Sequence, residues 1–173
     1  FREDIRRMGR NPGTRVIRQV MGQANLAQAT LLHIEPNELV LDLMRVRLVD
    51  DQPVMVASVL IPARICPNIG SADLTGSLYG YLASACGVYP DHATATIEAV
   101  PASAEIAALL GLGEASPILR IQRLTSTADG MPIELTDEFI RTDRCLCLVE
   151  SPTGYVSASL FNSLGADDKE NPG

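Results

Sequence analysis

Two arginines that lie two residues apart are the side chains of this sequence best suited to binding a ligand. Arg45 and Arg47 belong to the segment ELVLDLMRVRLVD, residues 38–50. If this segment is a β-strand, its alternate side chains point to the same face, so both guanidinium groups share a face with leucines. A guanidinium group that leaves water needs an anion. Its planar set of donors fits the oxygens of a phosphate or carboxylate group.

An acidic side chain of the protein itself is the alternative partner for such an arginine. Glu98, Glu134 and Glu138 are the candidates in this chain. One arginine is readily neutralised in this way, but two on one leucine-rich face are harder to satisfy internally. We therefore favour a cleft in which Arg45 and Arg47 bind an anionic ligand, and pairing with a glutamate stays open.

The segment GSLYGYL, residues 76–82, supplies two further candidates. Ser77 stands where a helix over residues 77–86 is expected to begin, and Gly87 is a typical residue to end it. A helix N-terminus presents free backbone N–H groups that favour anions. The alternative for Ser77 is an ordinary N-cap role. Tyr79 either reaches the same place or packs against the core.

A repeated unit predicts which elements position these residues. A shift of 78 positions aligns LLHIEPNELVLDLMRVR (31–47) with LLGLGEASPILRIQRLT (109–125) and places Arg45 on Arg123. Each copy reads as strand, short helix and hairpin of two long strands. The first copy has its strand at 14–21, helix at 25–32 and turn at 49–53, and the second has them at 93–100, 103–110 and 127–132.

The repeated β-α-β-β pattern predicts an α+β fold. Hairpins favour antiparallel pairing, so we expect an antiparallel sheet of roughly six strands with the helices packed on one side. Residues 53–62 are apolar on both faces and should form a central strand covered on both sides. In the last long strand, Glu134, Thr136 and Glu138 alternate onto one face.

Composition narrows the class of protein. The chain has 173 residues, 46% hydrophobic and only 4% aromatic, which suits one domain with an aliphatic core. Its formal net charge of −7 argues against nucleic-acid binding by this chain. No apolar run reaches the ~18 residues of a membrane span. The four cysteines show no C-x-x-C spacing, so we expect buried free thiols and no zinc site. The basic segment FREDIRRMGR is interpreted as a solvated helix face.

Several segments in fixed order resemble the UTRA domain, the effector-binding domain of the HutC/FarR branch of GntR-type bacterial transcription regulators. They are MGRNPGTRVI, LLHIEPNELVLDLMRVRLVDDQPVMV, DLTGSLYGYL and SPILRIQRLTSTADGMPIELTDEFIRTDR. The resemblance implies a chorismate-lyase-like sheet flanked by helices, a homodimer and a cytoplasmic location. It also implies that residues 1–12 are a linker from a missing winged-helix domain that binds operator DNA, that 13–162 are the UTRA domain, and that 163–173 are a flexible tail.

The resemblance also implies site residues. Arg45, Arg47 and Ser77 match positions that hold a phosphate in sugar-phosphate-binding members, Tyr79 matches a further pocket position, and Glu134 matches a residue that contacts polar groups of the ligand. Two departures argue against an amino-sugar ligand and favour a smaller or more apolar anion: Ala57 replaces a frequent Glu, and Ile140 replaces a frequent Tyr. We interpret Arg141, Asp143 and Arg144 as a structural set of ion pairs.

The resulting prediction is a sensor domain that binds a small phosphate-, phosphonate- or carboxylate-bearing metabolite and modulates DNA binding, as in a repressor. No catalytic residue, metal or cofactor is expected. One alternative is a dimerisation module without a functional ligand site. Another is a chorismate-lyase-like enzyme, for which Glu134 is the one plausible acid or base, because His33 and His92 fall outside the shared segments.

Overall fold

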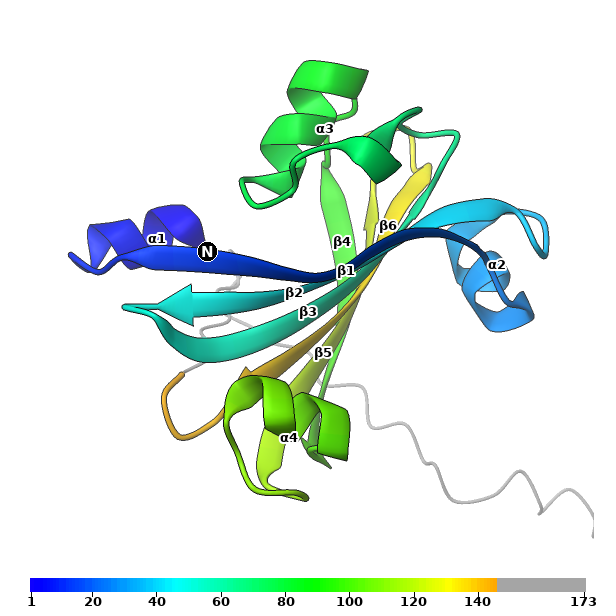
Figure 1. Ribbon diagram of the computed structural model, residues 1–173. Coiled ribbons are helices and arrows are strands. Elements are labelled where there is room, and N and C mark those ends of the chain that lie inside the picture. The colour runs from blue at the N-terminus through cyan, green and yellow to red at the C-terminus, as the bar shows by residue number, and fades with distance from the viewer. Residues whose placement is uncertain (146–173) are drawn as a thin grey trace, which may run out of the picture.

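A single antiparallel sheet of six strands forms the centre of the protein (Figure 1). The computed structural model describes residues 1–145. The strands follow one another across the sheet in the order β1-β2-β3-β6-β5-β4. Their bounds are Pro12–Gln23 for β1, Leu39–Val49 for β2, Gln52–Pro62 for β3, His92–Pro101 for β4, Pro117–Ser126 for β5 and Pro132–Arg141 for β6. The predicted α+β class and antiparallel sheet are confirmed.

Within residues 1–145 the sheet is accompanied by four short helices and one 3-10 turn: α1 (Arg2–Arg7), α2 (Leu26–Leu32), η1 (Ile69–Ser71), α3 (Leu78–Cys86) and α4 (Ala104–Leu110). Polar side chains cap three of them, since Asn25, Ser77 and Ser103 each accept a backbone N–H from the first turn. Helix α1 lies inside the segment 1–12 that was interpreted as a linker. The predicted tail, 163–173, lies outside the described residues.

The repeated unit is visible in the order of the strands. The first copy is β1-α2-β2-β3 and the second is β4-α4-β5-β6, and the two copies meet where β3 pairs antiparallel with β6. This order corresponds to an approximate two-fold rotation about an axis perpendicular to the sheet. The rotation keeps each face of the sheet on the same side, so equivalent residues of β2 and β5 project from the same face.

Helices cover both faces of the sheet, which corrects the expectation that they pack on one side. Leu41 and Leu43 pack with Leu78 and Leu82 of α3. The opposite face of β2 packs with α4 and α2. In Figure 1, α3 and α4 accordingly lie on opposite sides of the sheet. The reason is local: β2 and β3 alternate between two apolar faces, and each face has to be buried. The prediction of a doubly covered central strand at 53–62 is confirmed.

A disulfide bond joins Cys66, in the turn after β3, to Cys86 at the end of α3. Their Cα atoms are 5.4 Å apart. The expectation of free thiols is therefore wrong for this pair, whereas Cys145 is free and Cys147 lies outside the described residues. A separation of 20 residues gives no sequence signal for pairing. The fold creates the contact by returning the chain over the sheet.

Reduction of this disulfide is expected to lower the free energy of unfolding by about 3 kcal/mol, the loop-closure value for a cross-link of this span. The bond closes a loop with a sequence separation of 20. Urea unfolding with and without a phosphine reductant measures the change. Cys145→Ser is the matched control, because it removes a free thiol and should keep the full response to the reductant. An unchanged midpoint in reductant would show that the bond does not stabilise the fold.

Candidate anion-binding site

The five residues singled out in the sequence line one cavity of about 740 Å³. Arg45 and Arg47 come from β2, Ser77 and Tyr79 from the start of α3, and Glu134 from β6. The cavity lies on the face of the sheet that α3 covers. The fold therefore brings together side chains from three elements that are far apart in the sequence. Ligand binding by these residues stays a prediction.

Arg45 is buried without an anionic partner. Only 2% of its surface is exposed. Its Nη1 donates to the carbonyl oxygen of Leu74 at 3.3 Å, and its Nε has no hydrogen bond. Burial, followed by the neighbouring charge of Arg47, lowers the pKa of Arg45 to about 10. The group is still a cation at neutral pH, and one carbonyl dipole is its only hydrogen-bonding compensation among the described residues.

Arg47 is half-buried beside Arg45 on the same face. Its Nη1 donates to Thr14 Oγ1 at 2.9 Å, and its guanidinium carbon lies 5.6 Å from the centre of the Phe1 ring. Burial lowers the pKa of Arg47, and the positive charge of Arg2 adds to that shift. Hydroxyl and aromatic contacts are weak compensation for a full charge. The guanidinium groups of Arg45 and Arg47 therefore lie side by side and keep N–H donors available for an anion.

The three alternative glutamate partners are occupied elsewhere. Glu98 forms an ion pair with Arg120 at 3.1 Å. Glu138 forms one with Arg123, also at 3.1 Å. Glu134 accepts a hydrogen bond from a tyrosine hydroxyl. Within residues 1–145, none of the three makes a hydrogen bond or close ion pair with the two candidate arginines. Glu134 and Glu138 attract Arg45 and Arg47 only from a distance, and this attraction is smaller than the effect of burial on the pKa of either arginine.

Ser77 performs the capping role that was its alternative. Its Oγ accepts the backbone N–H of Gly80 at 3.1 Å, and it lines the cavity as well. Capping uses one acceptor of the hydroxyl and leaves its proton available to a ligand oxygen. The first turn of α3 also directs the positive end of the helix dipole toward this part of the cavity.

Tyr79 on α3 and Glu134 on β6 form a hydrogen-bonded pair in the cavity lining. The Tyr79 hydroxyl donates to Glu134 Oε2 at 2.6 Å and lies 3.4 Å from Thr125 Oγ1. Burial, with the negative charge of Glu134 as a second cause, raises the pKa of Tyr79 to about 12. Glu134 itself is only 2% exposed. The tyrosine hydroxyl stays protonated at neutral pH and holds the carboxylate in place, with the second carboxylate oxygen free to accept from a ligand.

Helix α1 forms part of the cavity wall, which the sequence did not indicate. Phe1, Arg2, Glu3 and Arg6 line the cavity, and Arg2 Nη1 donates to the carbonyl oxygen of Thr75 at 3.2 Å. The basic segment was interpreted as a solvated helix face, and this interpretation is wrong for the half-buried Arg2 but holds for Arg6, which is exposed although it also lines the cavity. Amphipathic periodicity in six residues is too short to reveal a buried side.

Arg123 and Thr136 also line the cavity and were not among the predicted site residues. A signal for Arg123 was present in the repeat, which aligns it with Arg45. Because the two copies are related by rotation about an axis through the sheet, equivalent arginines project into the same space from β2 and β5. The alternation of β6 had placed Thr136 on the same face as Glu134.

The two departures from the family pattern have different consequences. Ala57 lines the cavity and is the cross-strand partner of Arg45, so position 57 itself supplies no carboxylate to that arginine. Ile140 is buried, 7% exposed, opposite Met55 and Leu119 in the sheet. It does not belong to the lining that the described residues form. Only the change at position 57 therefore alters the cavity.

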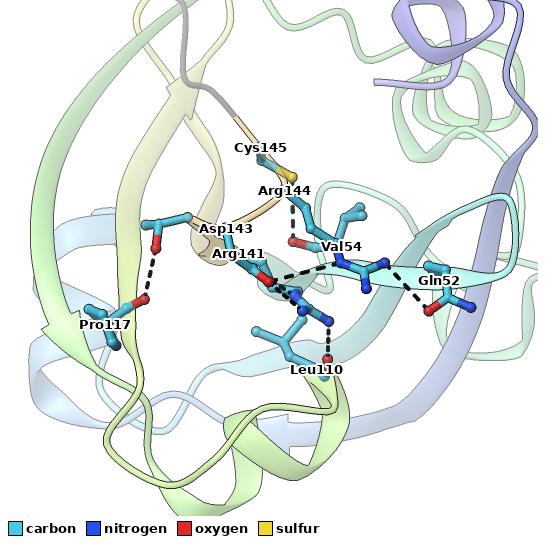
Figure 2. Close-up of polar contacts among 9 residues, drawn as sticks. Gln52, Val54, Leu110, Pro117, Arg141, Asp143, Arg144 and Cys145 are labelled. Carbon is cyan, nitrogen blue, oxygen red and sulfur yellow. Dashed lines mark hydrogen bonds and ion pairs between the residues drawn. The ribbon is translucent and has the colours of Figure 1, made fainter.

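Arg141, Asp143 and Arg144 form the structural set that was predicted for them (Figure 2). Arg141 donates to both oxygens of Asp143, at 2.9 and 2.6 Å, and to the carbonyl oxygen of Leu110 at 2.9 Å. Arg144 lies 3.9 Å from Asp143. The set ties the end of β6 to the end of α4, away from the cavity. Arg141 is thus a buried arginine with a full set of partners, in contrast to Arg45.

Two further observations hold for residues 1–145. No helix there is long and apolar enough to cross a membrane. No group of three or more histidine, cysteine or acidic side chains is arranged to hold a metal ion.

Comparisons with known proteins give a consistent result. The sequence profile of the UTRA domain matches residues 7–145. The transcriptional repressor NagR of Bacillus subtilis is 26% identical over 144 residues, which are 83% of this chain and 59% of NagR. The crystal structure of PhnF from Mycobacterium smegmatis covers 84% of this chain and 65% of its own, at 25% identity and a TM-score of 0.80. The ligand-binding domain of a putative GntR-family regulator from Bordetella bronchiseptica covers 77% and 86%, at 25% identity and a TM-score of 0.72.

Proposed function

Because this chain belongs to the UTRA domain family, the effector-binding domains of GntR-family transcriptional regulators, we propose that it senses a small anionic metabolite. The anion carries a phosphate, phosphonate or carboxylate group. Arg45, Arg47 and Ser77 bind that group, and Tyr79 with Glu134 contacts the rest of the ligand. The single observation that supports the proposal is the pair of guanidinium groups in the cavity lining, one buried and one half-buried, neither of which has a direct carboxylate partner among the described residues.

The matched relatives are transcriptional regulators and not enzymes. The chain spans about 60% of the length of NagR, so the DNA-binding activity of the whole protein is part of the proposal. In that proposal a winged-helix domain on the N-terminal side binds operator DNA, and the protein is a cytoplasmic homodimer of the HutC branch that acts as a repressor. A module for dimerisation alone would have no use for two buried cations that lower its stability.

Helix α1 offers a direct route from ligand to DNA-binding domain. It lines the cavity and lies at the N-terminal side of β1, where that domain would be attached. An anion next to Arg47 changes the electrostatic environment of Arg2, whose charge already acts on Arg47. A ligand can shift the regulator only by its differential affinity for two arrangements. Contacts between the ligand and α1 that exist in only one of the two arrangements of the protein would supply this difference in affinity.

Titration with inorganic phosphate, methylphosphonate and acetate, followed by calorimetry and thermal shift, tests the proposal. We expect at least one of these anions to bind and stabilise the protein. Arg47→Ala should weaken binding roughly 30- to 100-fold, the equivalent of one charge-assisted contact of about 2–3 kcal/mol. Arg120→Ala is the matched control, because Arg120 pairs with Glu98 and Asp137 outside the cavity lining. Equal losses in both variants, or binding of none of the anions, would contradict the assignment.

A further inference from the structure

Helix α3, which has Ser77 and Tyr79 at its start, is only loosely packed against the sheet. Of its nine residues, only Leu78 and Leu82 are buried. Within the described chain, the close backbone contacts of α2 with β6 and of α4 with β3 are more extensive than those of α3 with any other element. Ser77, Leu78 and Tyr79 line the cavity from the helix side. Because few apolar contacts hold α3, it belongs to the parts of the fold that move at low cost.

The disulfide between Cys66 and Cys86 fastens this helix to the core. Cys66 is fully buried in the turn that follows β3, and Cys86 is the half-buried last residue of α3. The bond thus attaches the end of α3 that lies opposite Ser77. Residues 83–85 are half-buried or exposed, so this end of the helix is held through the disulfide and the partly buried Val88.

The position of α3 decides whether the cavity can bind an anion. In the docked position, the Ser77 hydroxyl and the first turn of the helix share the cavity with Arg45 and Arg47. When only a fraction of the molecules has the binding-competent arrangement, the apparent affinity falls by that fraction. A cross-link removes conformations in which the two joined residues are apart, and it therefore keeps more molecules docked. Oxidised protein should bind an anion more tightly than reduced protein.

We propose that the Cys66–Cys86 bond is a redox switch, which gives the cavity a high affinity for its anionic ligand when the bond is formed and a lower affinity when it is reduced. The inference rests on the function proposed above and adds a second input, the thiol–disulfide state of the surroundings, to the concentration of the metabolite. Disulfides of cytosolic proteins are usually transient and often redox-sensing. The cytoplasmic location proposed above therefore favours a bond that forms and breaks over a permanent structural link.

A low-molecular-weight thiol supplies the electrons for reduction. Its thiolate attacks the Sγ of the half-buried Cys86, the S–S bond breaks, and Cys66 leaves as a thiolate that takes up the proton released by the thiol. A second thiolate attacks the sulfur of the attached small molecule, and Cys86 leaves and is protonated in the same way. Two small thiols thus become one small disulfide, and the protein gains two electrons and two protons. Re-oxidation by that disulfide follows the same steps in reverse.

Calorimetric titration with inorganic phosphate, with and without dithiothreitol, tests the switch. Dithiothreitol is uncharged at neutral pH, so it does not compete for an anion site. We expect reduction to weaken phosphate binding about 5- to 10-fold, the change that results if the docked position falls to roughly a tenth to a fifth of the molecules. Circular dichroism under the same conditions verifies that the reduced protein is folded. If methylphosphonate or acetate binds more tightly than phosphate, that anion replaces it.

Cys86→Ala breaks the bond without a reductant and serves if the reduced wild type does not fold. It leaves the buried Cys66 in place as a small apolar side chain. The variant should bind phosphate as weakly as the reduced wild type and should not respond to dithiothreitol. Cys145→Ser removes a free thiol and should keep the full response. Arg141→Met changes a residue outside the cavity lining, so it should keep the full affinity even though the fold loses stability.

Thermodynamic linkage supplies an independent check on the oxidised protein. In buffers with a fixed ratio of reduced to oxidised dithiothreitol, saturating phosphate should make the disulfide harder to reduce, by the same factor as the loss of affinity. An unchanged or higher phosphate affinity in the reduced protein and in Cys86→Ala would overturn the switch and leave the proposed function intact. Failure of the oxidised protein to bind any of the anions would overturn both.

Discussion

Replacing Arg45 with methionine is expected to abolish anion binding and, at the same time, to stabilise the ligand-free protein. Methionine is uncharged and similar in length, so the cavity wall is kept. Burial lowers the pKa of Arg45 to about 10, which means that the fold disfavours its charged form. At neutral pH both the folded and the unfolded chain carry the charge, and only the folded chain bears the cost of burying it. Removal of the charge removes that cost.

The size of this effect follows from two opposing contributions. The lowered pKa corresponds to about 3 kcal/mol at about 1.4 kcal/mol per pKa unit. The hydrogen bond to the Leu74 carbonyl, worth about 1 kcal/mol, is lost. The free energy of unfolding should therefore rise by about 1–2 kcal/mol, measured by urea denaturation without ligand. The cost of the charge is present in full below about pH 10 and shrinks only as the pH rises from there to the higher unfolded-state pKa, so the stabilisation should hold throughout the neutral range.

Arg141→Met is the matched control for this prediction. Arg141 is also buried, 7% exposed, but it donates to Asp143 and to the Leu110 carbonyl. Its replacement should destabilise the fold by about 2–3 kcal/mol and leave anion affinity unchanged, because a paired guanidinium is lost and no cavity residue is altered. If Arg45→Met loses as much stability as Arg141→Met, Arg45 has a stabilising partner within the protein and is not available to bind a ligand.

Ala57→Glu is expected to lower anion affinity by at least about 100-fold. Position 57 lies directly across from Arg45 in the pairing of β2 with β3 and lines the cavity. A glutamate there places a carboxylate beside the guanidinium group from within the protein. It occupies the donors that would bind the ligand and repels an incoming anion. Calorimetric titration with inorganic phosphate measures the loss, and the variant protein should remain folded because attraction between the new carboxylate and Arg45 offsets its repulsion by Glu138, the other cross-strand partner of position 57.

Ala57→Gln separates charge from size in this experiment. Glutamine fills the same space without a negative charge, so its loss of affinity should be about tenfold or less. If glutamine and glutamate lower the affinity equally, the effect is steric and the charge of Arg45 does not decide binding. If neither does, the anion binds away from β2.

Much of the fold could be predicted because its signals are local or repeated. Alternation of side chains in residues 38–50 and 132–141 indicates strands, and glycines at 87 and 111 end helices in the left-handed conformation. The alignment of the chain with itself then supplied the order of elements in both halves. The expectation that the helices pack on one side of the sheet was wrong. The apolar run 53–62 indicates that both faces of a strand are buried, but it does not indicate which helices cover each face.

By itself, the sequence determined the strands, the repeat and the face on which Arg45 and Arg47 lie, because these depend on residues that are neighbours along the chain. Only the tertiary structure decided that Glu138 pairs with Arg123 and Glu134 with Tyr79, which leaves the two arginines of β2 without a direct carboxylate partner among the described residues. It also decided that α1 lines the cavity and that Cys66 forms a disulfide bond with Cys86. Such contacts join residues that are far apart in the sequence. Strand register and helix placement set the distances between these residues, and no local sequence pattern encodes those distances.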